Sequence, residues 1–337
     1  MVDRALVVGL GSIGARHLRL MREALPKADI RVLRHSGCDG PIEHADGCFD
    51  TLHDACGFAP ELAVIASPAP FHLASAKALA DAGAHLLVEK PISHRVEGVA
   101  ELVGFCKAQG RVLHVGYNLR FLETLQYFRT ALRDRAIGPI HAVRCEIGQY
   151  LPDWRPAADY RDTVSARKEL GGGVLLELSH ELDLLRWLFG TPIWLSAWTG
   201  RQGALEIDVE DSAMLQMEFD AGTVAQVGID FLRRDTTRVC TAIGAEGSLR
   251  WDAIAGRVDL FTPETKEWVE LQTRQDHRDA SFRAQIGSWL GAIKNGKADT
   301  IAAKGEDGLA VMRMIEAARR SDADEGRRIS LEAGTCL

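Results

Sequence analysis

The sequence predicts an α/β protein with two domains, an N-terminal doubly wound parallel sheet and a C-terminal α/β domain with an open, mainly antiparallel sheet. The chain has 337 residues, a length typical of two domains. In its first third, short apolar runs alternate with helical patterns, which is typical of parallel strands covered by helices on both faces. Beyond Gly138, strand patterns follow one another across short turns, which indicates antiparallel pairing.

The first domain is predicted to span residues 1–120. Its first helix is indicated by Ile13, His17, Met21 and Leu25, because a spacing of four places them on one helix face. We expect strands at 5–9, 30–34, 62–66, 85–88 and 112–115, and helices at 13–25, 71–82 and 95–109.

The second domain is predicted to span residues 121–337 and to begin with a helix that joins it to the first. Turn residues such as Asp220-Ala221-Gly222 separate its strand patterns. We expect helices at 121–135, 174–189, 278–294 and 306–321, and strands at 140–149, 212–219, 223–231, 238–244, 247–252, 257–261 and 268–272.

The composition excludes several classes of protein. Lys and Arg number 40 and Asp and Glu 47, so the formal charge is −7, and 46% of the residues are hydrophobic. A disordered chain would be less hydrophobic, and a nucleic-acid-binding domain would carry basic blocks. No apolar run approaches the roughly 18 residues that span a membrane, and no cationic segment precedes the first apolar run, as it would in a signal peptide. The seven cysteines form no CxxC pair, so we expect reduced thiols, a cytoplasmic location, and neither nucleic acid nor membrane as a partner.

A glycine-rich loop, GLGSIG at residues 9–14, lies between the first expected strand and the first expected helix. In this GxGxxG pattern Gly9 permits a tight turn, Gly11 lets the backbone approach a pyrophosphate, and Gly14 lets helix and strand pack closely. Ser12 and Ile13 open the helix, whose free N–H groups attract phosphate. The alternative is a generic glycine-rich turn, but the strand–helix context favours a Rossmann domain that binds a dinucleotide.

The end of the second expected strand distinguishes NAD from NADP. NAD enzymes usually place Asp or Glu there, on the 2′-hydroxyl of the ribose. Here Arg34, His35 and Ser36 occupy the position, and no acid follows before Asp39. Because arginine pairs with a 2′-phosphate and serine adds a donor, we expect NADP as the cofactor. NAD, beside a solvated Arg34, is the alternative.

The triplet Glu89-Lys90-Pro91 follows another expected strand. Ligands of doubly wound sheets bind beyond the carboxyl ends of the strands, so Lys90 is expected to face the cofactor. Near a cationic nicotinamide the charged form of a lysine is disfavoured, which suits acid–base chemistry. The alternative is a surface lysine beside a salt-bridging glutamate.

A second cluster follows the three glycines at 171–173. Glu177, His180 and Asp183 stand three residues apart, so neighbours among them are expected on adjacent turns of one helix side. Histidine is suited to acid–base work near neutral pH. The alternative is an amphipathic helix whose polar face happens to include a histidine.

Trp154, Arg155 and Tyr160 precede these glycines. Aromatic faces suit sugar rings and arginines suit phosphate or carboxylate, so we expect these residues to bind substrate. Acids interleaved with them leave a solvated, salt-bridged loop as the alternative. Cysteines and histidines also gather between His35 and Cys56, but their spacing is irregular and we expect no metal site.

Taken together, GLGSIG near the start, EKP after a strand, and GGG followed by His180 and Asp183 resemble the glucose–fructose oxidoreductase, inositol dehydrogenase and rhizopine-catabolism (Gfo/Idh/MocA) family. The resemblance covers nearly the whole chain. It implies a Rossmann domain followed by an α/β domain with an open antiparallel sheet. It also implies oxidation or reduction of a sugar or cyclitol hydroxyl with NAD or NADP.

The resemblance assigns roles to individual residues on the cofactor side. Lys90 and His180 match the catalytic lysine and histidine of the family. Ser67, Pro68 and His72 are similar to its nicotinamide-side loop.

Further residues are expected to contact the cofactor or the substrate. Glu89 accompanies Lys90 on the cofactor side. Tyr117–Phe121 is similar to the substrate-side segment of the family, so Asn118 and Arg120 are expected to bind substrate together with Lys90, His180 and Asp183.

The sequence departs from the family pattern at two places. The usual Asn after Ser-Pro is Ala69, and Leu176 stands where many members carry an Asp four residues before the histidine. Glu177, three residues before His180, is expected to replace that Asp as a catalytic residue and to orient the histidine. The alternative is that Glu177 faces solvent and His180 works with Lys90 alone.

The sequence therefore predicts an NAD(P)-dependent oxidoreductase that transfers a hydride between nicotinamide and a secondary hydroxyl or keto carbon of a sugar, cyclitol or nucleotide-sugar. Two alternatives remain open: an NAD-dependent glycosidase of the same fold, and a sensor that binds NAD(P) without turnover. The open sheet of the second domain predicts a homodimer or homotetramer.

Overall fold

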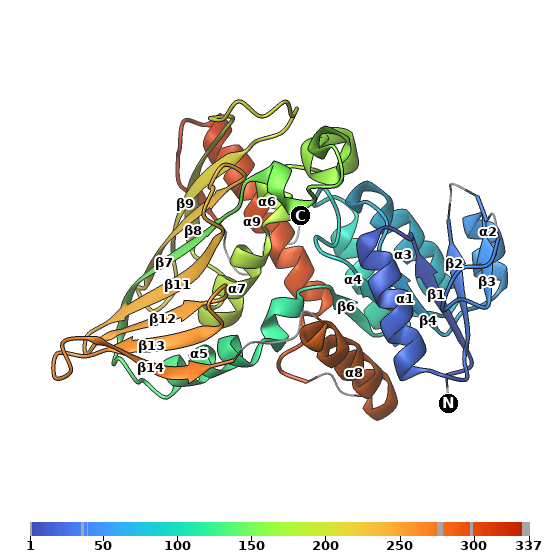
Figure 1. Cartoon of the computed structure of the whole chain (residues 1–337), viewed down its shortest axis with the longest axis horizontal. Coiled ribbons are helices and arrows are strands. Elements are labelled where there is room, and N and C mark those ends of the chain that lie inside the picture. The colour runs from blue at the N-terminus through green and yellow to red at the C-terminus, as the bar shows by residue number, and fades with distance from the viewer. Residues whose placement is uncertain (1, 35–36, 39, 275–278, 297–298, 332–337) are drawn as a thin grey trace. The chain divides into compact units, whose positions relative to one another are not determined.

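The computed structural model describes residues 2–34, 37–38, 40–274, 279–296 and 299–331 (Figure 1). The chain divides into two compact units. Unit 1 comprises Met1–Asn118 and Arg278–Met312, and unit 2 comprises Leu119–His277 and Arg313–Leu337. The chain thus returns to unit 1 after most of unit 2 is complete.

Unit 1 is built around a six-stranded parallel sheet with the order β3-β2-β1-β4-β5-β6. The chain starts at the centre of the sheet and reverses direction once, which is the order of a Rossmann fold. The predicted doubly wound sheet is therefore confirmed. Its elements are β1 (Arg4–Val8), α1 (Ser12–Ala24), β2 (Asp29–Leu33), β3 (Gly47–Phe49), α2 (Leu52–Gly57), β4 (Leu62–Ile65), η1 (Ala69–Phe71), α3 (His72–Asp81), β5 (His85–Val88), α4 (Val99–Ala108), β6 (Leu113–Val115) and α8 (Ala280–Asn295).

The sheet of unit 1 is buried on both faces, as parallel strands between helices must be. Val7 and Val64, on the two central strands, have no exposed surface. Ile286 and Trp289 of α8 join the same apolar cluster as Met21 of α1. This packing explains why a segment so late in the sequence belongs to unit 1.

Details of unit 1 differ from the prediction. The helix expected from residue 95 begins at Val99, after Gly98 with φ of 79°. β3 and α2 were not predicted, because they lie among the cysteines and histidines between His35 and Cys56, and Gly47-Cys48-Phe49 contains no aliphatic residue.

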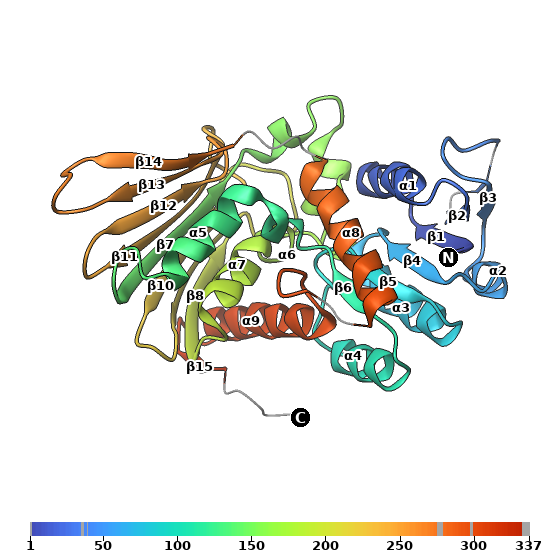
Figure 2. The same ribbon diagram turned by 90° about the horizontal axis from the view of Figure 1, so that it is seen from below.

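Unit 2 contains a nine-stranded sheet with the order β14-β13-β12-β11-β7-β10-β9-β8-β15. β7 and β10 pair in parallel, and the other ladders described in this sheet are antiparallel, which confirms the prediction of a mainly antiparallel sheet. Figure 2 shows α5 and α7 along one face of the sheet.

Helices and short turns link these strands. η2 (Asn118–Phe121) spans the boundary between the units, and α9 (Gly305–Ala323) begins in unit 1 and ends in unit 2. The other elements are α5 (Glu123–Arg133), β7 (Ile140–Gly148), η3 (Leu151–Trp154), η4 (Tyr160–Asp162), η5 (Val164–Ala166), η6 (Lys168–Leu170), α6 (Val174–Glu177), α7 (His180–Phe189), β8 (Trp194–Gly200), β9 (Ser212–Glu218), β10 (Val224–Asp230), β11 (Thr237–Gly244), β12 (Ser248–Asp252), β13 (Arg257–Phe261), β14 (Trp268–Thr273) and β15 (Ile329–Ser330).

β8 was not predicted from the sequence. Its buried residues alternate with Trp194, Ser196 and Trp198, and the two tryptophans make the less buried side of the strand apolar as well. An apolar residue on both faces hides the alternation by which a half-buried strand is recognised.

The helix predicted over residues 174–189 is interrupted. α6 ends at Glu177 and α7 begins at His180, and Leu178 between them has φ of −103° and ψ of 25°, outside the helical range. The expectation that Glu177 and His180 lie on adjacent turns of one helix is therefore wrong.

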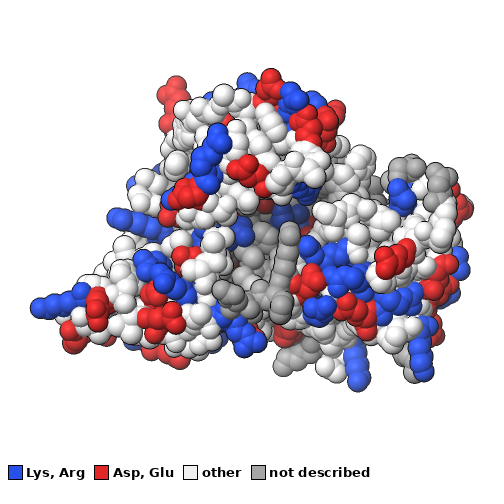
Figure 3. Space-filling model, viewed as in Figure 1, with Lys and Arg blue, Asp and Glu red and all other residues white. Residues whose placement is uncertain are grey.

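No helix in the described ranges is both long and apolar enough to cross a lipid bilayer. On the face shown in Figure 3, acidic and basic side chains are interspersed over the described surface. This mixture agrees with a sequence that has no basic blocks.

Candidate functional site

The glycine-rich loop joins β1 to α1 and passes the end of β4. Gly9 has φ of 87°, and a Cβ at this position would lie 2.8 Å from the backbone nitrogen of Ser67. A Cβ on Gly14 would lie 2.1 Å from the carbonyl oxygen of Gly9. Only glycine at both positions lets α1 and β4 approach the loop so closely.

Space opens at the remaining glycine of the pattern. A Cβ built on Gly11, the N-cap of α1, meets no heavy atom of the described residues within 4 Å. Ser12, Ile13 and Gly14 form the first turn, which contains no acidic side chain. The N–H groups and the positive dipole end of α1 thus border a position that favours an anion, and this cradle fits the pyrophosphate of a dinucleotide.

Arg34 directly follows β2, the strand beside β1. Its backbone N–H donates to the carbonyl oxygen of Phe49 (2.9 Å), which holds it at the carboxyl edge of the sheet. This is the position at which Rossmann domains distinguish the two ribose 2′-groups. His35 and Ser36, the other residues predicted to select NADP, lie outside the described residues.

His72 connects the turns that follow β4 and β5. Its Nε2 lies 2.6 Å from the carbonyl oxygen of Ser67, and its Nδ1 lies 3.0 Å from that of Pro91. Burial lowers the pKa of His72, although the hydrogen bonds to these carbonyl groups act in the opposite direction. The ring therefore fixes the segment of Ser67 and Pro68 relative to the Lys90-Pro91 turn.

Lys90 lies at the carboxyl edge of the parallel sheet, two residues after β5 ends at Val88. β1, β4 and β5 are neighbours in the sheet, so Gly9, Ser67 and Lys90 follow three adjacent strands along one edge. Lys90 therefore lies two strands away from the glycine-rich turn at Gly9. The lysine precedes a cis peptide bond to Pro91.

Glu89 is buried and does not form the surface salt bridge that we considered as an alternative. His17 Nε2, from α1, donates to Glu89 Oε1 at 2.6 Å. The backbone N–H of Lys90 donates to Glu89 Oε2 at 3.1 Å. Sequence reasoning placed His17 only on one face of the first helix, yet a polar residue in a stripe with Ile13 and Met21 was a signal for a buried partner.

Two of the three glycines before α6 allow close packing. Gly173 has φ of 103°, and a Cβ on it would lie 2.4 Å from Glu210 Oε1. A Cβ on Gly172 would lie 2.4 Å from the carbonyl oxygen of Val164. Burial raises the pKa of Glu210, whose Oε1 accepts the N–H of Leu175 at 3.2 Å.

Glu177 and His180 lie on either side of the break between α6 and α7, and both are half-buried. Ser165 Oγ donates to Glu177 Oε2 at 2.9 Å, a contact that no sequence pattern indicated. Glu181, by contrast, is buried, and its Oε1 accepts from Arg238 Nε at 2.8 Å. The role of Glu177 as the partner of His180 stays a prediction.

Three residues predicted to bind substrate have protein partners. Asn118 Nδ2 donates to Ser281 Oγ of α8 at 2.8 Å. Arg120 and Asp183 bind one another through two hydrogen bonds in a buried ion pair. The structure shows these contacts within the protein. Binding of substrate by the three residues stays a prediction.

Trp154, Arg155 and Tyr160 are brought together by unit 2. They line one narrow cavity with Leu151, Thr163 and Ser165. The indole N–H of Trp154 donates to the carbonyl oxygen of Gln149 (3.1 Å). Salt bridges are present in the same loop, but they involve the neighbouring exposed Arg161 and Arg167. The cavity and the salt-bridged surface thus occupy different residues of the segment.

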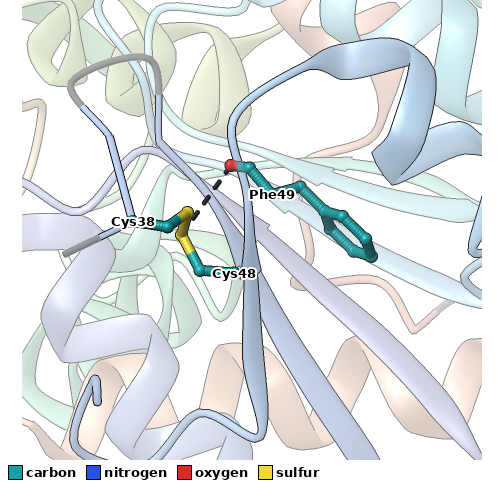
Figure 4. Close-up of a disulfide and its surroundings, with 3 residues drawn as sticks. All are labelled: Cys38, Cys48 and Phe49. Carbon is teal, nitrogen blue, oxygen red and sulfur yellow. Dashed lines mark hydrogen bonds between the residues drawn. A yellow bond between two sulfur atoms is a disulfide. The ribbon is translucent and has the colours of Figure 1, made fainter. Parts of the chain in front are cut away.

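The cysteines near β3 differ from the expectation of reduced thiols. Cys38 and Cys48 form a disulfide, whose surroundings Figure 4 shows. Their sulfur atoms and a carboxylate oxygen of Asp50 lie within 4.8 Å of one another. Because each sulfur is bonded to the other, the arrangement in this structure is a cross-link between the segment after β2 and β3. The expectation is wrong for this pair.

Two family models match the chain. A model described as an oxidoreductase family with an NAD-binding Rossmann fold covers residues 4–117. A model described as the GFO/IDH/MocA C-terminal domain covers residues 125–250.

Two relatives with known names match to different extents. D-apiose dehydrogenase from Paraburkholderia graminis is 26% identical over 360 aligned positions, which take in 98% of this chain and 90% of the relative. 1,5-Anhydro-D-fructose reductase from Ensifer adhaerens is 31% identical over 179 residues. This alignment covers 50% of this chain and 50% of the relative, so the chain spans about half the length of this second relative.

The fold is also found among solved structures. The WlbA dehydrogenase from Bordetella pertussis in complex with NADH and UDP-GlcNAcA superposes with a TM-score of 0.82 over 99% of each chain, at 23% sequence identity.

The two family models agree with the Rossmann sheet, the glycine-rich loop and the nine-stranded sheet described above, and together they identify the family. The chain belongs to the Gfo/Idh/MocA family of NAD-binding oxidoreductases.

Proposed function

We propose that this chain transfers a hydride between a nicotinamide cofactor, with NADP(H) preferred, and a secondary hydroxyl or keto carbon of a sugar, cyclitol or nucleotide-sugar. The observation that supports this most is the row of Gly9, Ser67 and Lys90 after adjacent strands β1, β4 and β5. It combines an anion-binding turn with a protonatable amine on one edge of the Rossmann sheet.

The cofactor would supply the hydride, while the residues of this chain bind it, orient it and move protons. The turn at Gly9–Gly14 and the N-terminus of α1 would hold the pyrophosphate. Arg34 would pair with the 2′-phosphate of NADP. Lys90 and His180 would exchange a proton with the substrate oxygen, and Glu177 would orient His180.

The substrate class follows from the chemistry of unit 2 and from the relatives. Aromatic side chains such as Trp154 and Tyr160 suit a sugar ring, and Arg155 suits a carboxylate or phosphate. The narrow cavity that they line has room for about one water molecule in this structure, so a sugar ring would need it to widen. The relatives named above act on apiose and anhydrofructose, and the WlbA complex holds UDP-GlcNAcA. A sugar or sugar derivative therefore fits best.

The proposal includes a homo-oligomer. A cytoplasmic location stays a prediction, and the Cys38–Cys48 disulfide counts against it, since disulfides are rare in cytosolic proteins. On the sheet of unit 2, large apolar side chains are exposed, among them Met214 (56%) and Trp198 (43%). They line a hollow with Gln216 and Gly228. Large exposed apolar patches mark association surfaces, so a second copy of this sheet is the expected occupant. Light scattering after size exclusion should give a dimer or tetramer.

The function is tested by incubating the purified protein with NAD(P)⁺ or NAD(P)H and a panel of sugars, cyclitols and nucleotide-sugars. Stoichiometric change in absorbance at the nicotinamide band with one substrate class supports the proposal. Net hydrolysis without change in NAD(P)H would instead identify a glycosidase. Tight cofactor binding without turnover across the panel would identify a sensor.

A further inference from the structure

A buried histidine and a buried glutamate join the phosphate-binding helix to the lysine turn. His17, in the second turn of α1, has no exposed surface, and only 9% of the Glu89 side chain is exposed. His17 Nε2 donates to Glu89 Oε1 at 2.6 Å. Both residues belong to unit 1.

The His17 ring also contacts an aromatic side chain. It packs edge-on against Phe282 of α8, with centroids 5.7 Å apart and an interplanar angle of 82°. Nδ1 is buried and has no hydrogen-bond partner among the described residues. The carboxylate of Glu89 is therefore the polar contact that the structure gives this ring, and it selects Nε2 as the hydrogen-bearing nitrogen.

Gly116 leaves room for the Glu89 carboxylate because it has no side chain. A Cβ on Gly116, just after β6, would lie 2.7 Å from Glu89 Oε2. Burial raises the pKa of Glu89, but the hydrogen bond from His17 and the nearby positive charges outweigh it, so the net shift is downward. Glu89 is thus an anion at neutral pH, and its second oxygen accepts the backbone N–H of Lys90 at 3.1 Å.

We propose that His17 is a positioning residue for Lys90. The ring holds one oxygen of Glu89 and thereby presents the other oxygen to the Lys90 backbone, so the lysine stays at the carboxyl edge of β5. The carboxylate also attracts the Lys90 side chain electrostatically. A buried carboxylate that loses its donor is destabilised, so without His17 the side chain turns or takes up a proton and releases the Lys90 N–H.

This inference rests on the proposed function only in giving Lys90 its role in proton transfer. The anchoring of the Lys90 backbone is independent of any substrate. The test therefore has one readout without catalysis and one with it.

The first readout is hydrogen–deuterium exchange by mass spectrometry on peptides that cover residues 86–94. Pro91 contributes no amide, and the Glu89 N–H, which donates to the carbonyl oxygen of Ile65, serves as an internal reference. In His17→Leu the Lys90 amide should exchange at least about tenfold faster, because a hydrogen bond to a charged group is lost. In His17→Gln, whose amide can still donate to Glu89, exchange should stay close to wild type. Met21→Leu on the same helix face is the packing control.

The second readout is turnover with saturating cofactor. His17→Leu should lose about tenfold to a hundredfold in kcat, as when partners that orient a functional group are removed, with an unchanged cofactor Kd. His17→Gln should recover most of this loss. If Lys90 exchange does not change in His17→Leu, or if Leu and Gln variants behave alike, the proposal is overturned. If wild type turns over no substrate while exchange still separates Leu from Gln, the proposed function fails and the anchoring role stands.

Discussion

Arg120 and Asp183 form a two-bonded ion pair in the interior of unit 2. Arg120 Nε lies 2.8 Å from Asp183 Oδ2, and Arg120 Nη2 lies 2.6 Å from Asp183 Oδ1, with each side chain 3% exposed. Arg120 belongs to η2, and Asp183 lies in the first turn of α7, which His180 begins. The pair therefore fixes the helix of the predicted catalytic histidine to the start of unit 2.

Removing one partner of this pair should strongly destabilise the protein. Arg120→Met leaves the carboxylate of Asp183 buried without its cation, and such a change typically costs about 3–5 kcal/mol. Denaturant unfolding of the variant measures the loss. As a control, Arg327→Met breaks an exposed contact with Asp324, for which a loss below about 1 kcal/mol is expected. Similar losses in the two variants would show that the buried pair contributes no more than an exposed one.

The parts of the fold that follow a clear periodicity were predictable, and the parts set by tertiary contacts were not. The strands of the Rossmann sheet are mainly apolar, and each was found except β3, whose sequence Gly47-Cys48-Phe49 contains no aliphatic residue. β8 was missed because Trp194 and Trp198 give its less buried side an apolar surface. No Gly or Pro in the sequence marks the break at Leu178. The break is accompanied by a tertiary contact, the hydrogen bond from Ser165 to Glu177, which no local pattern specifies.

The candidate site shows the same division. The turn at Gly9 and the position of Lys90 follow from local motifs, because glycine patterns and strand ends are encoded in adjacent residues. The partners of Arg120 and Glu89 lie 63 and 72 residues away in the sequence. No local pattern specifies such pairs, so Arg120 and Asp183 were interpreted only as substrate ligands.

Glu177 should contribute to turnover if it orients His180. Glu177→Gln keeps the size of the side chain and can still accept from Ser165, so stability should change little. We expect a lower kcat and a shifted pH–rate profile, because the amide cannot stabilise a protonated imidazole. Glu169→Gln, an exposed acid before the glycines, is the control. Glu181→Gln is unsuitable, since Glu181 is buried against Arg238. Equal, small effects of the Glu177 and Glu169 substitutions would remove Glu177 from the catalytic set.

Arg34 should determine the preference for NADP(H). Wild type is expected to bind NADPH more tightly than NADH, and Arg34→Ala should weaken NADPH by about tenfold or more, because a charge-assisted contact with the 2′-phosphate is lost. Fluorescence quenching gives the four dissociation constants. Arg4→Ala, at the opposite end of β1, should leave both affinities unchanged. Tighter binding of NADH by wild type would refute the assignment.

The Cys38–Cys48 cross-link predicts a definite thiol count. The sequence has seven cysteines, so 7 − 2 = 5 should react in the denatured, unreduced protein and seven after reduction. Cys48→Ser should lower stability by about 2 kcal/mol, because the cross-link restricts the unfolded chain. Cys56→Ser, at a half-buried free thiol, is the comparison. Seven reactive thiols before reduction would show that the bond does not form in the isolated protein.

The central claim is that Lys90 takes part in the chemical step of an oxidoreductase. It is tested most directly by the single-turnover rate of hydride transfer in Lys90→Met, with cofactor and substrate saturating. Lys77→Met, an exposed lysine on α3, is the control. We predict that the rate falls by about 10²–10⁴ in Lys90→Met while the cofactor Kd stays close to wild type, since the glycine turn and α1 provide most of the binding. A Lys90→Met rate equal to that of Lys77→Met would contradict the account.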